Sequence, residues 1–297
     1  MFSKKRLKVV VSKWQTTVVG GVNVVDFGKS TKYTFTDAKI SCTIKKVPAT
    51  CGYTASIDIY GVSQTSLNQI TNIAWIQGQI TPMGVTIYAD DGNGFVQVFE
   101  GGVMEATPNY QNVPDVSIHI ESSMMVYPNL KKVPPISLTT NTIISDFCKE
   151  LCSKYDYGCK TSPELSLMFW KGTTKEFNQK DFGGRVKELC RAAGLSFTMG
   201  NNSVEFYKRG EGFRRVWNLD KTQYDGYPTF KNTGMTLRIH HITTKMNCGD
   251  GIRITGSIVP QANAYWEVVS MSYKLETWKE NGAWDIDVHC IRVVEND

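Results

Sequence analysis

Apolar and polar residues alternate strictly in several short segments of this chain, and such alternation predicts β-strands with one buried face. The segment "WDIDVHCIRV" (284–293) shows the pattern most clearly. Its apolar set is Trp284, Ile286, Val288 and Cys290, and its polar set is Asp285, Asp287 and His289. Because successive side chains of a strand point to opposite faces, the first set is expected in a core and the second on a polar face.

Two long parts of the chain, residues 30–128 and 211–297, repeat this alternation. In the first part the strand-like segments include "KYTFTDAKISCTIKKV", "ASIDIYGV" and "PDVSIHIESS", and "SQTSLNQITN" has the spacing of a short helix. The turn "DGNG" (91–94) lies between two strand-like runs and predicts a hairpin. In the second part they are "GMTLRIHHI", "GIRITGSIV", "YWEVVSMSYKLET" and "GAWDIDVHCIRV". Short strands with regular turns are typical of a barrel or sandwich.

Residues 129–210 have a different pattern, with apolar residues at helical spacing. The segments "NTIISDFCKELCSKY" and "DFGGRVKELCRAAG" each predict an amphipathic helix, and Gly194 is a stop signal for the second. A hairpin is expected in "LSFTMGNNSVEFYK". The sequence therefore predicts a mainly β chain in three parts: a β-domain at 1–128, a small α+β insert at 129–210, and a second β-domain at 211–297.

Composition and charge leave this picture unchanged. The 297 residues have a formal net charge of +5, which is small for the length and demands neither nucleic acid nor an anionic membrane. The charge is concentrated in the insert, with 13 Lys/Arg against 8 Asp/Glu in residues 129–210. This excess fits either a solvated basic face or a surface that meets an acidic partner.

The row Asp285, Asp287 and His289 invites a metal or acid–base interpretation, but its geometry argues against both. Residues two apart on a strand lie roughly 6.6–7 Å apart, whereas zinc ligands converge at about 2 Å. Phosphate-loop, dinucleotide-binding, zinc-protease and serine-hydrolase motifs are absent from the sequence. We therefore expect no catalytic residue, no metal site and no cofactor.

The eight cysteines contain no C-x-x-C pair, and the four histidines have no metal spacing relative to them. The apolar run at the amino end is interrupted by Lys8 and Lys13, so no signal-peptide core forms, and no stretch approaches the about 20 apolar residues of a spanning helix. We expect a protein made in a cytoplasm, with reduced thiols and no membrane insertion by this chain.

Three stretches together resemble the baseplate hub proteins of contractile-tailed bacteriophages and the hub portion of type VI secretion spikes. They are "VFEGGVMEATPNYQNVPDVSIHIESS", then "DFGGRVKELCRAAGLSFTMGNNSVEFYKRG", and then "YDGYPTFKNTGMTLRI" with "GDGIRITGSIV" and "YWEVVSMSYKLET". The resemblance covers roughly residues 30–293 and rests on the strand order, glycines and aromatic residues of the whole chain.

The resemblance implies a homotrimer in the tail baseplate of a virion. Each chain of such a hub carries two β-barrel domains related to the tail-tube fold, so that three chains form a pseudo-sixfold ring between the tail tube and the central spike. Further partners would be the tape-measure protein and other baseplate proteins, and DNA would pass through the ring. Asp285, Asp287 and His289 would then face this channel, a neighbouring chain or solvent.

Two other functions are compatible with the sequence. A β-rich tail protein could bind a receptor or carbohydrate, in which case exposed aromatic side chains should cluster on loops. A cell-wall-degrading enzyme would need a catalytic site that only the fold assembles. The second β-domain runs nearly to residue 297, which leaves no room in this sequence for an added lysozyme-like domain.

Overall fold

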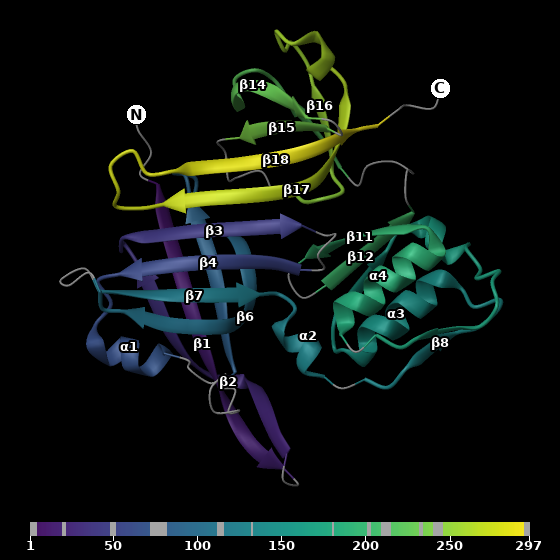
Figure 1. Cartoon of the computed structure of the whole chain (residues 1–297), viewed down its shortest axis with the longest axis horizontal. Helices are drawn as coiled ribbons and strands as arrows, with labels where there is room; N and C mark the ends of the chain where they lie inside the picture. Colours follow the sequence, from purple (N-terminus) through teal and green to yellow (C-terminus); the bar gives the residue numbers. More distant parts are fainter. Residues whose placement is uncertain are drawn as a thin grey trace.

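A computed structural model describes residues 5–19, 22–47, 52–71, 82–111, 116–131, 133–179, 181–200, 203–208, 215–231, 234–239 and 246–293. Two β-rich regions lie one above the other, and a smaller helical region lies beside them (Figure 1). In the amino-terminal region the elements are β1 (Arg6–Val19), β2 (Val22–Thr36), β3 (Ile40–Val47), β4 (Gly52–Tyr60), α1 (Gln64–Ile70), β5 (Met83–Asp90), β6 (Val96–Asn109) and β7 (Ser117–Ser123).

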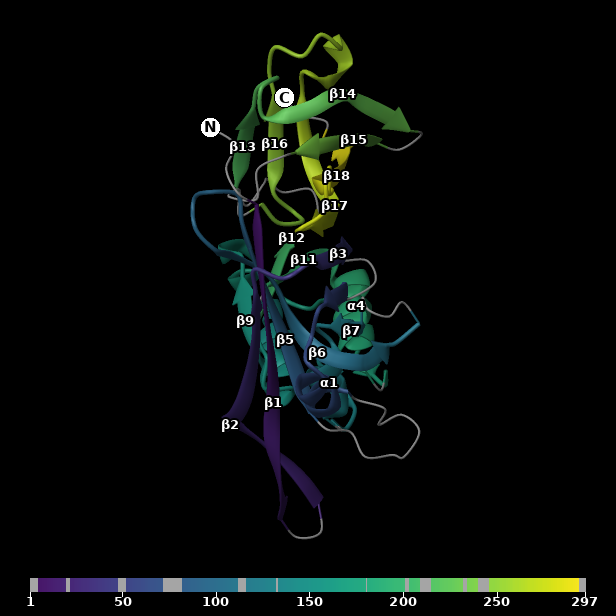
Figure 2. The same ribbon diagram turned by 90° about the vertical axis from the view of Figure 1, so that its left-hand side faces the viewer.

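Alternation of side chains builds the core of this first region. The inward residues of β4 and β7 include four isoleucines, with Ile57 and Ile59 facing Ile120 and Ile118 across the pair, and all four are fully buried. Strands β1 and β5 cover them, and α1 contributes Leu67 and Ile70 to the same core. The β1–β2 hairpin extends past the rest of the molecule (Figure 2).

The insert combines short strands with two amphipathic helices. Its elements are α2 (Val126–Leu130), β8 (Ile136–Leu138), α3 (Ile144–Lys154), β9 (Gly158–Thr161), η3 (Pro163–Ser166), β10 (Lys175–Phe177), α4 (Phe182–Ala193), β11 (Leu195–Gly200) and β12 (Ser203–Lys208). Helix α4 begins where the Asp181 carboxylate accepts from the Gly184 amide, and it ends at Gly194, whose φ is 66°. Strands β11, β12 and β9 form a separate small sheet.

A buried arginine fastens α4 to the segment that enters the insert. The Arg185 guanidinium donates to the carbonyl oxygens of Gln179, Pro134 and Val133 at 2.6, 2.8 and 2.8 Å. It also lies over the Tyr155 ring, 5.7 Å from the centroid. Only 2% of the Arg185 surface is exposed, so these carbonyl groups and the ring replace the water that a cation normally binds.

The carboxy-terminal region returns to strands. Its elements are β13 (Val216–Leu219), β14 (Tyr224–Lys231), β15 (Gly234–Ile239), β16 (Gly251–Ile254), η4 (Pro260–Ala262), β17 (Tyr265–Glu276) and β18 (Trp284–Arg292). As the sequence predicts, Trp284, Ile286, Val288 and Cys290 of β18 are all buried, and the residues between them are partly exposed.

The two β regions share one sheet. Strand β17 pairs with β18 on one side and with β3 on the other, from Met271 opposite Lys46 to Glu276 opposite Ser41. The resulting strand order is β14-β15-β18-β17-β3-β4-β7-β6-β5-β1-β2, with β16 and β13 branching from β17. We call the β3–β17 pairing the seam.

Buried side chains fix the seam and join it to the insert. Lys46 is 7% exposed, and its ammonium group lies over the rings of Tyr273 and Tyr53, at 4.9 and 5.6 Å from the centroids. The Tyr53 hydroxyl in turn bonds the Thr198 hydroxyl of β11 at 3.2 Å. These contacts bring all three parts of the chain together at one place.

The expected fold class, mainly β with a small α+β insert, is confirmed. Strand β1 and the first part of β2 were not expected, because the strand pattern was assigned only from residue 30 onward. The run Val9-Val10-Val11 shows no clean alternation, although Val9 and Val11 are buried and Val10 is half-buried. The boundaries at residues 128 and 210 stay a prediction. None of the helices in the described ranges has the length and apolar character needed to span a membrane.

Candidate functional site: the polar face of the long sheet

The strand register aligns polar side chains across seven strands, from β15 to β6. Residues directly opposite each other in antiparallel strands project to the same side of the sheet. One row contains Asp285, Lys274, Thr43, Ser56, Glu121 and Glu105. A neighbouring row contains Arg238, Asp287, Ser272, Lys45 and Thr54. We call this surface, which crosses the seam without interruption, the polar face.

Asp285, Asp287 and His289 all lie on the polar face, as their alternation predicts. The first two share a cation that the sequence analysis missed: Arg238 Nε lies 2.8 Å from Asp287 Oδ1, and its Nη1 lies 3.5 Å from Asp285 Oδ2. The hydrogen bond and charge of Asp287 raise the pKa of Arg238. His289 Nδ1 lies 3.4 Å from the Thr236 hydroxyl. The row is therefore partly neutralised and does not converge on a point.

The polar face is acidic, although the whole chain is basic. The paired strand residues of this face include seven carboxylates and three lysine or arginine side chains, and two further lysines reach it from adjoining turns: Lys279 pairs with Glu276 at 2.7 Å and Lys39 lies over the Tyr60 ring. The carboxylates belong to Asp58, Glu105, Glu121, Glu267, Glu276, Asp285 and Asp287, and the cations to Lys45, Lys274 and Arg238. Carboxylates therefore outnumber lysine and arginine side chains on this face, whereas the whole chain carries a net charge of +5.

His119 sits between two of these carboxylates. Its Nδ1 lies 2.8 Å from Asp58 and its Nε2 lies 3.1 Å from Glu121, while Glu105 of the adjacent strand faces Glu121. Burial disfavours the imidazolium, but the hydrogen bonds and charges of Asp58 and Glu121 outweigh it, so the pKa of His119 is raised above 6.5. This cluster could not be predicted from the sequence, because Asp58 and His119 are 61 residues apart.

The His119 cluster should make stability depend on pH. Because the folded pKa lies above that of the unfolded chain, the contribution is complete below pH 6.5 and is lost as the pH rises through the folded value. We expect the Tm advantage of the wild type over His119→Gln to shrink as the pH rises above 6.5. His289→Gln is the matched control, since that ring contacts the Thr236 hydroxyl. An advantage that stays constant with pH would contradict the assignment.

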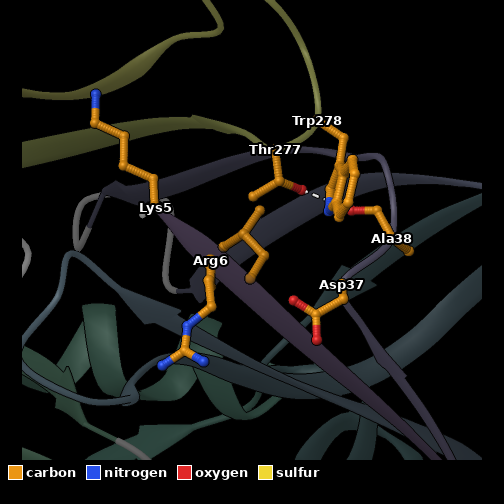
Figure 3. A pocket seen from close by; sticks show the side chains of 7 residues that line it. Lys5, Arg6, Asp37, Ala38, Thr277 and Trp278 are labelled. Carbon is orange, nitrogen blue, oxygen red and sulfur yellow. Dashed lines mark hydrogen bonds between the residues drawn. The ribbon is translucent and has the colours of Figure 1, made fainter. Parts of the chain in front are cut away.

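A second candidate, a small pocket at the end of the seam, is structural. Figure 3 shows side chains of β1, the 37–38 turn and the 277–278 turn around it. The Thr277 hydroxyl donates to the Ala38 carbonyl at 2.9 Å and accepts from the Ile40 amide at 3.2 Å. Asp37 and Trp278 both have φ near 55°, so two tight turns meet here. The Arg6 side chain that lines the pocket forms an ion pair with Asp90.

Neither place has the geometry of a catalytic or metal centre. In the part of the chain that the structure describes, no three His, Cys, Asp or Glu side chains are arranged to hold a metal ion. Asp90 and Asp91, an adjacent acid pair, lie at the hairpin turn, where Asp90 Oδ1 accepts from the Gly92 and Gly94 amides at 2.8 and 2.9 Å. These two hydrogen bonds show that the Asp90 carboxylate stabilises the turn.

Comparison with known proteins identifies the fold. No protein-family model matches the sequence, and no curated protein matches it significantly. Among solved structures, a tail protein from Neisseria meningitidis matches with a TM-score of 0.61 and 6% identity over 97% of each chain. The 43 kDa tail protein of prophage MuSo2 from Shewanella oneidensis matches with a TM-score of 0.58 and 9% identity, covering 98% of this chain and 97% of that one.

A type VI secretion component shows the same likeness. The E. coli c3393 protein, described as structurally similar to the T4 bacteriophage tail proteins gp27 and gp5, matches with a TM-score of 0.58 and 7% identity. The match covers 87% of this chain and 74% of that protein. The resemblance drawn from the sequence is thus confirmed at the level of architecture: this chain has the fold shared by phage tail proteins and hub-like components of type VI secretion systems.

Proposed function

We propose that this chain is a non-enzymatic structural component of a phage tail, namely the central hub of the baseplate. Three copies form a ring that joins the tail tube to the central spike and gives DNA a passage. The tape-measure protein and other baseplate proteins are its further neighbours in the virion. The fold shared with tail proteins supports the structural role, and the acidic polar face is the observation that supports the passage.

The polar face has the properties that a DNA passage requires. A duplex carries one phosphate charge per about 1.7 Å, so lysines and arginines along a channel would hold it by releasing counterions. Carboxylates outnumber these cations on the polar face, and Arg238 is occupied by Asp285 and Asp287. Asp285, Asp287 and His289 would face the passage together with the His119 cluster. DNA would then slide along the face without binding.

The tripartite organisation suits a ring of three. We assign residues 1–128 and 211–297 as two tube-like β units and residues 129–210 as a peripheral insert. Two such units in each of three chains give six positions around an axis, which matches a threefold spike to a sixfold tube. The seam already joins the two units of one chain edge to edge, so one strand pairing of the proposed ring exists within the monomer.

Ring formation also needs surfaces for the neighbouring chain. The described sheet path ends at β14 and at β2, and open strand edges are ready to pair with another chain. On β14 the Tyr227 and Phe230 side chains are 66% and 41% exposed, and Val216 of β13 is 45% exposed. Exposed apolar side chains next to an open edge are typical of a subunit interface.

Native mass spectrometry of the purified chain tests the proposal. We expect a trimer of about three times 33.3 kDa. Tyr227→Lys should raise the dissociation constant of the trimer by about tenfold or more, because charge replaces a large aromatic contact. Leu167→Lys is the control, since Leu167 is 79% exposed but lies in the insert. A wild type that stays monomeric at micromolar concentration, alone and with its spike protein, would contradict the ring.

A further inference from the structure

A short segment at the surface of the insert is paired with the chain along one of its edges. It comprises residues 167–171, which we call the insert edge. An isolated antiparallel bridge joins Phe169 to Ile143, at the start of α3. Two backbone hydrogen bonds of 2.9 Å flank this bridge, one donated by the Trp170 amide and one accepted by the Met168 carbonyl. The segment therefore lies against the entry to α3 like a strand.

The opposite side of the insert edge is open. Because the bonds of the bridge come from the residues before and after Phe169, the amide and carbonyl of Phe169 itself point away from Ile143. Among the hydrogen bonds of the described residues, none engages these two groups. Phe169 is 52% exposed, so another strand can reach its backbone. Unpaired backbone groups of this kind are a template for strand addition.

Apolar side chains accompany the open backbone. Leu167 is 79% exposed, the largest exposure among the large apolar residues that the structure describes, and Phe169 lies two residues later. Met168 and Trp170 are partly buried and pack against the core, so the outward apolar surface belongs to Leu167 and Phe169. Backbone donors and acceptors beside exposed apolar side chains are the combination by which a sheet edge binds an extended peptide.

The insert edge has a fixed shape. Leu165, just before it, is fully buried. The Trp170 indole donates to the Thr173 carbonyl at 2.9 Å, and the Thr140 hydroxyl donates to the Gly172 carbonyl at 3.0 Å. A side chain at Gly172 would lie 2.6 Å from the Trp170 ring, so the turn that follows the insert edge needs glycine. A preorganised edge loses little conformational freedom when a partner binds.

The charge around the insert edge indicates what kind of partner fits it. Residues 160–175 contain three lysines and one glutamate, and the whole insert has 13 Lys/Arg against 8 Asp/Glu. Lys171 is exposed and lies at the end of the insert edge. The ion pairs among the described residues of the insert engage Lys131, Lys149, Lys154 and Lys175, but not Lys171. Carboxylates on a partner would complement this surface.

We propose that the insert edge binds an extended, acidic segment of another polypeptide, which pairs with the Phe169 backbone as an added strand. Apolar residues of that segment cover Leu167 and Phe169, and its carboxylates lie beside Lys171. Of the two explanations that the basic composition of the insert allows, the open edge favours an acidic partner. The proposal concerns only the insert and stands whether or not the chain forms a trimeric ring.

Fluorescence anisotropy on the full-length chain tests the proposal with three labelled peptides. The first alternates glutamate and valine, and the second has lysine in place of each glutamate. The third is the acidic peptide with N-methyl groups on alternate backbone nitrogens, which removes its donors along one edge. We expect saturable binding of the first peptide. The dissociation constant should be about tenfold higher or more for the other two, since one has the wrong charge and one lacks the donors.

Variants locate the binding surface. Leu167→Glu should raise the dissociation constant of the acidic peptide by about tenfold or more, because a repelling charge replaces an apolar contact. Ile258→Glu is the matched control and should leave binding unchanged, since Ile258 is 77% exposed but lies in the carboxy-terminal region. Lys171→Glu should reverse the preference between the acidic and the basic peptide.

Several results would overturn the proposal. They are an acidic peptide that does not bind saturably, equal binding of the acidic and basic peptides, and binding that Leu167→Glu leaves unchanged. Displacement of the acidic peptide by duplex DNA would assign the basic insert to nucleic acid instead. A lower oligomeric mass of Leu167→Glu in native mass spectrometry would show that a second copy covers the insert edge. The ring itself is tested separately by Tyr227→Lys.

Discussion

Arg185→Ala should lower the free energy of unfolding by about 3–5 kcal/mol, the range found when one partner of a buried charged contact is removed. The change would leave the carbonyl oxygens of Val133, Pro134 and Gln179 without the donor that they share, and the Arg185 side chain that it removes is only 2% exposed. Each unsatisfied buried group costs about 1–3 kcal/mol. It would also leave a cavity under the Tyr155 ring.

Chemical denaturation followed by far-UV circular dichroism measures this effect. Arg191→Ala is the matched control, because Arg191 is on the same helix and exposed, and we expect a change within about 0.5 kcal/mol there. Arg185→Lys should fall between the two, since an ammonium group keeps the charge but lacks the planar fork that reaches three carbonyls. Equal stability of Arg185→Ala and the wild type would show that the buried guanidinium does not stabilise the insert.

Val288→Asp should prevent stable folding, and His289→Asp should be tolerated. Val288 is fully buried between Leu237 of β15 and Met271 of β17, so an aspartate there would either be ionised in an apolar site or hold a proton far above its usual pKa. We expect a loss of about 4 kcal/mol or more. His289, one residue later, faces Thr236 and Ser270 on the polar face.

Comparing these adjacent positions separates the effect of the face on which the aspartate lies from the effect of the aspartate itself. Both variants introduce the same side chain into the same strand, so strand propensity is nearly constant between them. Soluble yield and thermal unfolding report the difference. If both variants lost stability equally, the one-sided burial of β18 would be wrong, and with it the existence of a continuous polar face.

Local pattern was sufficient to predict most individual elements. The period of two in 284–293 predicts β18, and helical spacing with a glycine stop predicts α4. Helix α1 also lies where the sequence places it. These features depend on interactions between residues near each other in the chain, which is why one sequence reveals them.

Partnership between distant elements could not be predicted in the same way. Nothing in residues 40–47 indicates that their sheet partner is 265–276, and nothing near Asp287 indicates Arg238, 49 residues away. The face of β18 that carries Asp285, Asp287 and His289 could be assigned from alternation. The acidity of the surface to which they belong needed the register of six further strands.

The seam also has a consequence for the order of events during protein synthesis. Strand β3 leaves the ribosome early, but the partner of its outer edge arrives late, and the contact that ends the seam joins residues 237 apart. At about 5–20 residues per second, the ribosome needs roughly 10–50 s to bridge that separation. During this interval one edge of β3 has no partner strand, although its other edge can already pair with β4. Lys45 and Lys46, on opposite faces of that strand, are the type of residue that discourages edge-to-edge aggregation while the chain waits for its own last strands.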